Sequence, residues 1–205
     1  MKTIACPCEN VFETDLPDVV DLDADQERFR SLTEGTFMTA RCPACGKLVK
    51  TEFPLRVLWA GKGISFNVVP EADRTDHLRS VAEGGVAEEV LIGYPELADR
   101  VSVIAAGLDP VAVEALKYYL MVKAEESAPD AETSVWFFGV ASDALEFHLF
   151  GLRPAEVAVS RIPMKVYEKT LADLRAHPES EPFRSLRVGP YLSVQNLLRA
   201  EEEEE

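Results

Sequence analysis

The sequence lacks any apolar run long enough to cross a membrane as a helix. Its longest stretch without a charged side chain covers eleven residues, 188–198, whereas a membrane helix needs about 20 apolar residues. The first residues also lack the apolar core of a secretory signal peptide. We therefore expect no membrane association and a cytoplasmic location.

Histidine is scarce, and familiar catalytic motifs are missing. The three histidines, His77, His148 and His177, are dispersed and distant in sequence from the cysteines. No H-E-x-x-H, G-x-S-x-G or G-x-G-x-x-G pattern is present, although each would bring catalytic or phosphate-binding groups together. The leading hypothesis is a non-enzymatic adaptor that binds another protein. The alternative is an enzyme with a cryptic site in residues 71–205.

Basic residues are few relative to acids. The chain has 21 Lys and Arg against 36 Asp and Glu, a net charge of −15. Sequence-independent binding to DNA or RNA depends on cations that meet phosphates, so this balance argues against it. An exception is the segment 41–62, with five bases, one acid and the aromatic residues Phe53 and Trp59. Nucleic-acid binding through this basic hairpin is the third hypothesis, and Glu201–Glu205 is expected to be a solvated acidic tail.

Cysteine is absent after residue 45, and the four cysteines form two tight pairs. They are Cys6 with Cys8 and Cys42 with Cys45. Paired cysteines in a cytoplasmic chain indicate metal or redox chemistry before structural disulfides. Zinc in structural sites takes four tetrahedral thiolates. We therefore predict one structural zinc per chain, bound by these four cysteines.

The two pairs differ in form. Cys42-Pro43-Ala44-Cys45-Gly46 has the two-residue spacing of a zinc knuckle, and its glycine can take the positive φ that follows such a turn. In the first pair only Pro7 separates the cysteines, and we expect Asn10 to take the left-handed conformation there. A redox dithiol and plain reduced, buried thiols are the alternatives to zinc. Strand-like flanks around Cys42–Cys45 favour zinc, since a thioredoxin-like motif begins a helix.

Hydrophobic periodicity predicts an α+β protein. We expect N-terminal zinc-ribbon-like β-hairpins with an inserted helix, a helical pair with Lys117 near its C-terminal end, and an antiparallel β/helix body. Helices are expected at 24–32, from Pro95, from Pro110 and at 163–176. Strands are expected at 2–5, 10–13, 36–40, 48–53, 55–60, 64–69, 133–140, 144–150 and 155–160, with a linker at 125–132.

These elements predict two domains and a tail. Residues 1–125 would form the first domain, with a ribbon-like core at about 1–70 and the helical pair at about 94–124. Residues 126–200 would form the second domain, followed by the tail 201–205. The strand 133–140 carries Val135, Trp136, Phe137 and Phe138 in succession. Both of its faces are apolar, so we expect cover from the helix 163–176 or from a second copy of the chain in a homodimer.

The sequence resembles the CpXC domain proteins of bacteria and archaea. The resemblance covers about residues 1–125 and implies a fold and a bound metal, but no reaction. The first cysteine pair departs from the family pattern by one missing residue. The matching residues are Cys6-Pro7-Cys8, Cys42-Pro43-Ala44-Cys45-Gly46, Phe66-Asn67-Val68-Val69-Pro70, Gly107-Leu108-Asp109 and Glu114-Ala115-Leu116-Lys117.

Overall fold

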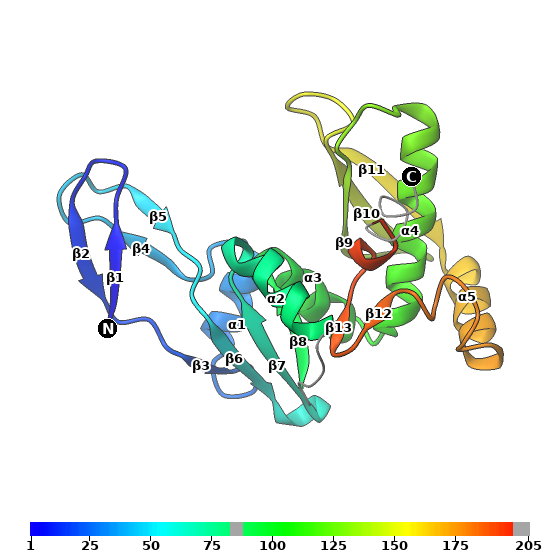
Figure 1. Cartoon of the computed structure of the whole chain (residues 1–205), viewed down its shortest axis with the longest axis horizontal. Coiled ribbons are helices and arrows are strands. Elements are labelled where there is room, and N and C mark those ends of the chain that lie inside the picture. The colour runs from blue at the N-terminus through cyan, green and yellow to red at the C-terminus, as the bar shows by residue number, and fades with distance from the viewer. Residues whose placement is uncertain (83–87, 199–205) are drawn as a thin grey trace. The chain divides into compact units, whose positions relative to one another are not determined.

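The chain folds as an α+β protein, as the sequence predicts (Figure 1). The structure is a computed structural model that describes residues 1–82 and 88–198. The chain divides into two compact units, Met1–Ala98 and Asp99–Glu205, and helix α3 (Gly93–Ala105) runs across the division. The predicted tail, Glu201–Glu205, lies outside the described residues. Whether residues 1–125 form an independent domain stays a prediction.

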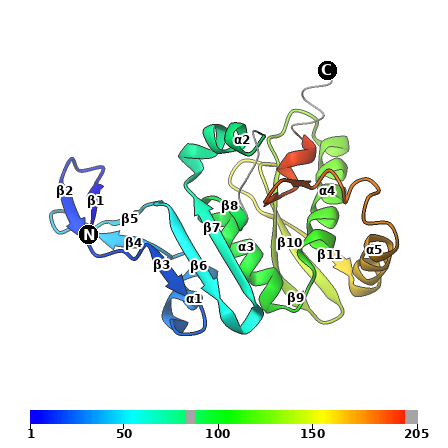
Figure 2. The same ribbon diagram turned by 60° about the horizontal axis from the view of Figure 1, so that its bottom comes forward.

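The first unit contains two small hairpins (Figures 1 and 2). The four cysteines lie in the turns of these hairpins. Both pairs of strands are antiparallel. The strands are β1 (Lys2–Ala5) and β2 (Val11–Thr14), then β4 (Thr39–Arg41) and β5 (Leu48–Lys50).

Four further strands of this unit lie side by side in the order β8, β7, β6, β3. The β6–β7 pair is antiparallel, whereas β3–β6 and β7–β8 are parallel. Two short helices, α1 (Gln26–Thr33) and α2 (Arg74–Ala82), complete the unit. The strands are β3 (Val19–Asp21), β6 (Leu55–Trp59), β7 (Ile64–Val69) and β8 (Glu89–Ile92), with 3-10 turns at Ala60–Lys62 and Glu71–Asp73.

The acidic segment before α1 caps its own turns. Asp21 accepts hydrogen bonds from the backbone N–H groups of Asp23 and Ala24, and Asp25 caps α1 by accepting from Arg28 N–H at 2.9 Å. Side-chain oxygens at these positions satisfy N–H groups that a helix start leaves without partners.

The second unit is a three-stranded antiparallel sheet, in the order β11, β10, β9, with helices packed against it. Helix α4 contacts both β9 and α5, and the buried side chains of all these elements form one core. The elements are α4 (Pro110–Ser127), β9 (Ser134–Ala141), β10 (Ala144–Phe150), β11 (Ala158–Pro163), α5 (Met164–Ala176), β12 (Arg187–Val188) and β13 (Tyr191–Leu192).

Several expectations for this unit need correction. The expected linker at 125–132 begins inside α4, which continues to Ser127. The strand expected at 155–160 is β11, which starts at Ala158, after Ala155 adopts a left-handed φ of 60°. Hydrophobic periodicity predicts that Tyr119 lines the apolar face of α4, but this side chain is 54% exposed. The expectation that β9 is covered on both faces within one chain is wrong for Phe138, which is 64% exposed. A register shift in the β9–β10 pairing leaves Phe138 without a partner on β10, so it is the extra residue of a β-bulge.

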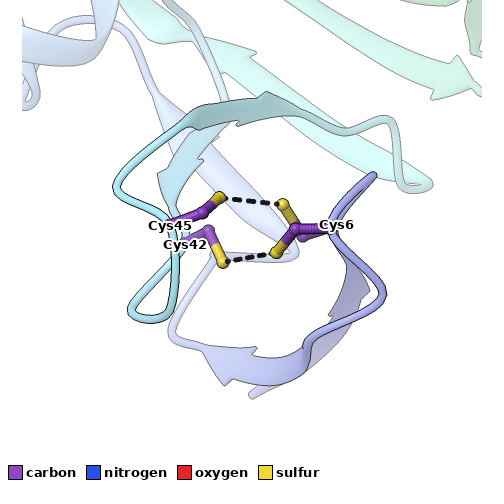
Figure 3. Close-up of side chains that lie close together, drawn as sticks. Cys6, Cys42 and Cys45 are labelled. Carbon is purple, nitrogen blue, oxygen red and sulfur yellow. Dashed lines mark hydrogen bonds between the residues drawn. The ribbon is translucent and has the colours of Figure 1, made fainter.

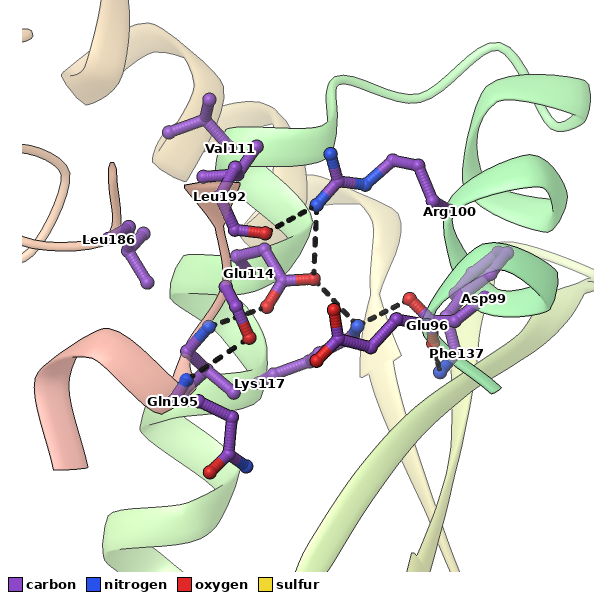
Figure 4. Close-up of polar contacts among 12 residues, drawn as sticks. Glu96, Asp99, Arg100, Val111, Glu114, Lys117, Phe137, Leu186, Leu192 and Gln195 are labelled. Atoms are coloured by element: carbon purple, nitrogen blue, oxygen red, sulfur yellow. Dashed lines mark hydrogen bonds and ion pairs between the residues drawn. The ribbon is translucent and has the colours of Figure 1, made fainter. Parts of the chain in front are cut away.

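Lys117 is not a helix-terminal cation but part of a buried ionic cluster. The cluster consists of Asp99, Arg100, Glu114 and Lys117, each 5% exposed or less. The Lys117 ammonium pairs with both carboxylates, donating to Glu114 Oε1 at 2.7 Å and also to Asp99 Oδ2 (Figure 4). The Nη2 atom of Arg100 lies 3.9 Å from Glu114 Oε1.

Backbone groups satisfy the rest of this cluster. Asp99 Oδ1 accepts from Phe137 N–H at 2.6 Å, and Glu114 Oε2 accepts from Val194 N–H at 2.9 Å. Arg100 donates to Leu192 O at 2.8 Å (Figure 4). The cluster therefore joins α4, β9 and the C-terminal segment, and it leaves no carboxylate oxygen pointing at solvent.

The pKa values of the cluster follow from its pairing. Burial opposes the charged form of Lys117, but Asp99 and Glu114 outweigh burial and raise the pKa of the ammonium. Burial also opposes ionisation of Glu114, yet Lys117 and Arg100 hold the pKa of that carboxyl below its usual value. For Asp99 burial dominates, so its pKa is raised despite Lys117.

Candidate metal centre

The four cysteines converge on one point between the two N-terminal hairpins. Their Sγ atoms all lie within 4.8 Å of one another. Sγ of Cys6 lies 3.6 Å from Sγ of Cys45, and Sγ of Cys8 lies 3.7 Å from Sγ of Cys42 (Figure 3). Cys6 and Cys42 are buried, whereas Cys8 and Cys45 are exposed. Four cysteines in this arrangement can bind a metal ion.

The second turn has the geometry that its spacing predicts. Cys42 N–H donates to Lys47 O, and Gly46 N–H donates to Cys42 O, both at 2.9 Å. Gly46 takes a left-handed φ of 73°. The strands β4 and β5 flank this turn, so the pair lies at the tip of a hairpin and not at the start of a helix.

The first turn has the same hydrogen-bond pattern as the second but is shorter by one residue. Cys6 N–H donates to Asn10 O at 2.9 Å, and Glu9 N–H donates to Cys6 O at 2.8 Å. Each bond spans one residue fewer than its counterpart in the second turn. Glu9 takes the left-handed conformation, with a φ of 68°. The expectation that Asn10 would do so is wrong, because Glu9 directly follows Cys8 just as Gly46 directly follows Cys45, and the missing residue lies between the two cysteines.

Asn10 instead serves the sulfur cluster itself. Its side-chain amide donates to Cys42 Sγ at 3.7 Å. The sequence shows an asparagine after the first pair, but nothing in its spacing indicates that the amide turns toward the opposite hairpin.

The surroundings of the two buried thiols differ. Burial opposes ionisation of Cys42, but the backbone N–H groups of Cys45 and Ala44 outweigh it and lower its pKa to about 6. The Cys8 N–H lowers the pKa of Cys6, but burial and the neighbouring thiols outweigh it and raise that pKa to about 12. Backbone donors thus converge on Cys42 and favour its anionic, metal-ligating form.

Comparison with known protein families matches residues 4–117 to the CpXC family, described as "CpXC protein". This match covers more than half of the chain and includes both cysteine pairs. The chain belongs to the CpXC family. A relative from Treponema pallidum (strain Nichols), called "Uncharacterized protein", is 32% identical over 220 residues, which cover 96% of this chain and 98% of the relative. No solved structure matches the chain.

Two other residues that the sequence offered for binding or catalysis, Trp59 and His148, pack against neighbouring side chains. Trp59, considered for base stacking, is buried and packs edge-to-face on Phe29 at 5.7 Å. Strand alternation predicts that His148 points outward from β10. Its ring stacks on Phe138 with the ring centroids 4.0 Å apart, and its Nε2 lies 3.4 Å from Glu146 Oε1. Helices that combine the length and apolar character of a membrane span are absent from residues 1–82 and 88–198.

Proposed function

We propose that this CpXC protein is a zinc-stabilised, non-enzymatic adaptor that acts in the cytoplasm and binds another protein. The observation that carries the metal assignment is the convergence of four Sγ atoms within 4.8 Å. Zinc–sulfur bonds of about 2.3 Å in a tetrahedron separate the sulfurs by about 3.8 Å. The separations of 3.6 and 3.7 Å across the two turns agree with that spacing.

A structural role for the zinc follows from its proposed shell. Four thiolates from Cys6, Cys8, Cys42 and Cys45 fill the tetrahedral positions, so none is left for water or substrate. The four cysteines form no disulfide, which supports a location in the cytoplasm, where thiols stay reduced. The metal would join two hairpins that are each too small to be stable alone.

The adaptor role is supported by exposed apolar side chains outside the metal centre. Leu48 on β5 and Phe138 on β9 are 59% and 64% exposed. The charged groups of the buried ionic cluster could otherwise serve catalysis, but they bond to one another and to backbone groups.

Elemental analysis of the protein, purified without added metal, tests the zinc assignment. We expect one zinc per chain, and fewer than four thiols that react before a chelator is added. Cys42→Ser should lose the zinc. Ser31→Ala, which changes a residue of α1 outside the cluster, should retain it. A metal content near zero with four freely reactive thiols contradicts the proposal, and iron in place of zinc contradicts the choice of metal.

A further inference from the structure

The hairpin β4–β5 presents a basic face with an apolar centre. In the antiparallel register, Arg41 pairs with Leu48 and Thr39 pairs with Lys50, so these four side chains share one face. Arg41 and Lys50 are exposed, and Leu48 is 59% exposed between them. We call this set of four residues the basic face.

This face differs in charge from the rest of the chain. Residues 36–51 contain three bases and no acid, within a protein of net charge −15. Among the described residues, the Lys50 ammonium has no hydrogen-bond or ion-pair partner. The Arg41 guanidinium donates one bond, to Gly46 O at 2.7 Å, and keeps its other donors. Both cations are therefore available to an acidic ligand.

A cavity of about 340 Å³ adjoins the basic face at Lys50. Its wall is mainly apolar, and its carboxylate is already used, because Glu52 accepts from the backbone N–H groups of Tyr94 and Glu71. A cavity of this size is at the small end of ligand sites and accommodates one large side chain. Its lining includes Leu32, Phe37, Lys50, Glu52, Tyr94 and Pro95.

We propose that the basic face and this cavity together dock an acidic peptide segment of a partner protein, with one large apolar residue in the cavity. This inference rests on the proposed protein-binding role. Carboxylates of the segment would pair with Arg41 and Lys50, and its apolar residue would pack against Phe37 and Tyr94. The pairing of an apolar cavity with two cations favours such a peptide over a nucleic acid, whose many phosphates the net charge of −15 repels.

Peptide titration of the zinc-loaded protein, followed by backbone amide NMR, tests this proposal. The probes are the blocked hexapeptide EDFEDE, its glycine counterpart EDGEDE, and a single-stranded DNA ten-mer. We expect EDFEDE to shift amides of residues 39–52 and 94–98, and EDGEDE to bind more weakly. Higher salt should weaken binding, because the pairs are exposed.

Charge reversal provides the matched control. Lys50→Glu should weaken EDFEDE about fivefold to tenfold, because an exposed attraction becomes a repulsion of similar size. Lys165→Glu makes the same change in charge on exposed α5 and should leave binding unchanged. Ala98→Leu, which narrows the cavity, should weaken EDFEDE but not EDGEDE.

Four outcomes would overturn the proposal. They are the absence of amide shifts with EDFEDE, equal effects of Lys50→Glu and Lys165→Glu, equal binding of both peptides, or tighter binding of DNA to this face. Shifts confined to other surfaces of a zinc-loaded sample would refute this docking site and leave the protein-binding role in place. A sample without zinc would instead refute the proposed function.

Discussion

A single residue, Glu9, shows how the shortened first turn is made. It occupies the left-handed conformation that Gly46 occupies in the second turn, with φ values of 68° and 73°. A residue with a Cβ is strained there by roughly 1 kcal/mol, whereas glycine is not. The shorter turn therefore forms in spite of its sequence, because the hairpin and the sulfur cluster hold it in place.

Glu9→Gly should therefore stabilise the zinc-loaded protein by about 0.5–1 kcal/mol, through relief of this strain. Urea unfolding curves at fixed zinc concentration measure the change. Glu13→Gly is the matched control, since Glu13 is an exposed residue of β2 with an ordinary φ, and it should destabilise by a similar amount. A loss of stability with Glu9→Gly would contradict the strained-turn interpretation.

Lys117 shows the opposite case, a charge that its surroundings fully satisfy. Lys117→Met should lower the free energy of unfolding by about 3–5 kcal/mol, because Asp99 and Glu114 would remain buried without their shared cation. Chemical denaturation at pH 7 measures the loss.

The exposed Lys123, which pairs with Glu126 on the same helix, provides the control. Lys123→Met should cost less than 1 kcal/mol. A similar small cost for Lys117→Met would mean that its pairs contribute little to stability.

The raised pKa of Lys117 also sets a pH dependence. Because the folded-state pKa lies above the unfolded value of about 10.4, the contribution to stability is complete below that value. It is then lost as the pH rises through the folded-state pKa.

At the scale of single residues, the sequence predicts the clustering of the cysteines better than it predicts the ionic cluster. Four cysteines in two pairs are rare enough to indicate their own chemistry, and the structure brings all four together. Acids and bases are common, so Asp99 and Lys117 do not stand out among 57 charged residues. Their pairing appears only in the packing of the two helices that carry them.

Among the elements, β9 is the one whose burial differs from the sequence-based prediction. Its run of aromatic residues predicts burial of both faces, but the bulge at Phe138 turns that ring outward onto His148. The outer face of the sheet then carries an exposed apolar side chain beside the pair Glu146–Arg161. A face that bears both signs of charge around an apolar centre can meet a second copy of itself.

We predict that the protein forms a dimer through this face and that Phe138→Asp yields a soluble monomer. The substitution should change the midpoint of thermal unfolding little at low concentration, since the side chain is 64% exposed. Light scattering over a range of concentrations measures the mass. Leu48→Asp is the control at another exposed site and should stay dimeric. A wild-type protein that is monomeric at high concentration would contradict the prediction.

The sequence does not predict the two short strands β3 and β8, for a different reason. β3 and β8 have three and four residues and pair in parallel with β6 and β7. β8 is buried on both faces and so shows no alternation, while β3 is too short for alternation to be recognised, so periodicity alone does not identify either strand. By contrast, β6, β7 and β10 were predicted within a residue of their ends, because alternation and turn residues mark them.

For the whole molecule, a metal bound at the four cysteines would make stability uneven along the chain. All four cysteines belong to the first unit, and the second unit has a core of its own. Removal of zinc with a chelator should therefore increase hydrogen exchange in β1, β2, β4 and β5, and leave α4 and β10 protected. Hydrogen exchange with mass spectrometry measures both.

Cys45→Ser should reproduce this pattern without a chelator, and the Ser31→Ala protein should not. If chelation loosens both units equally, the two do not unfold independently. If chelation changes neither unit, the metal does not support the ribbon.

The closing bonds of the ionic cluster also affect how the chain can fold during synthesis. Glu114 accepts its backbone hydrogen bond from Val194, which is 80 residues further along the chain. Arg100 donates to the carbonyl of Leu192, which is 92 residues further along. Until the ribosome has made those residues, the helices that carry these charges cannot be buried without leaving charged groups partly unsatisfied. The cysteine hairpins meet no such delay, since all their partners lie within the first 50 residues. Nascent chains should therefore acquire their metal early, whereas prematurely terminated chains should expose a second unit that proteases can recognise and remove.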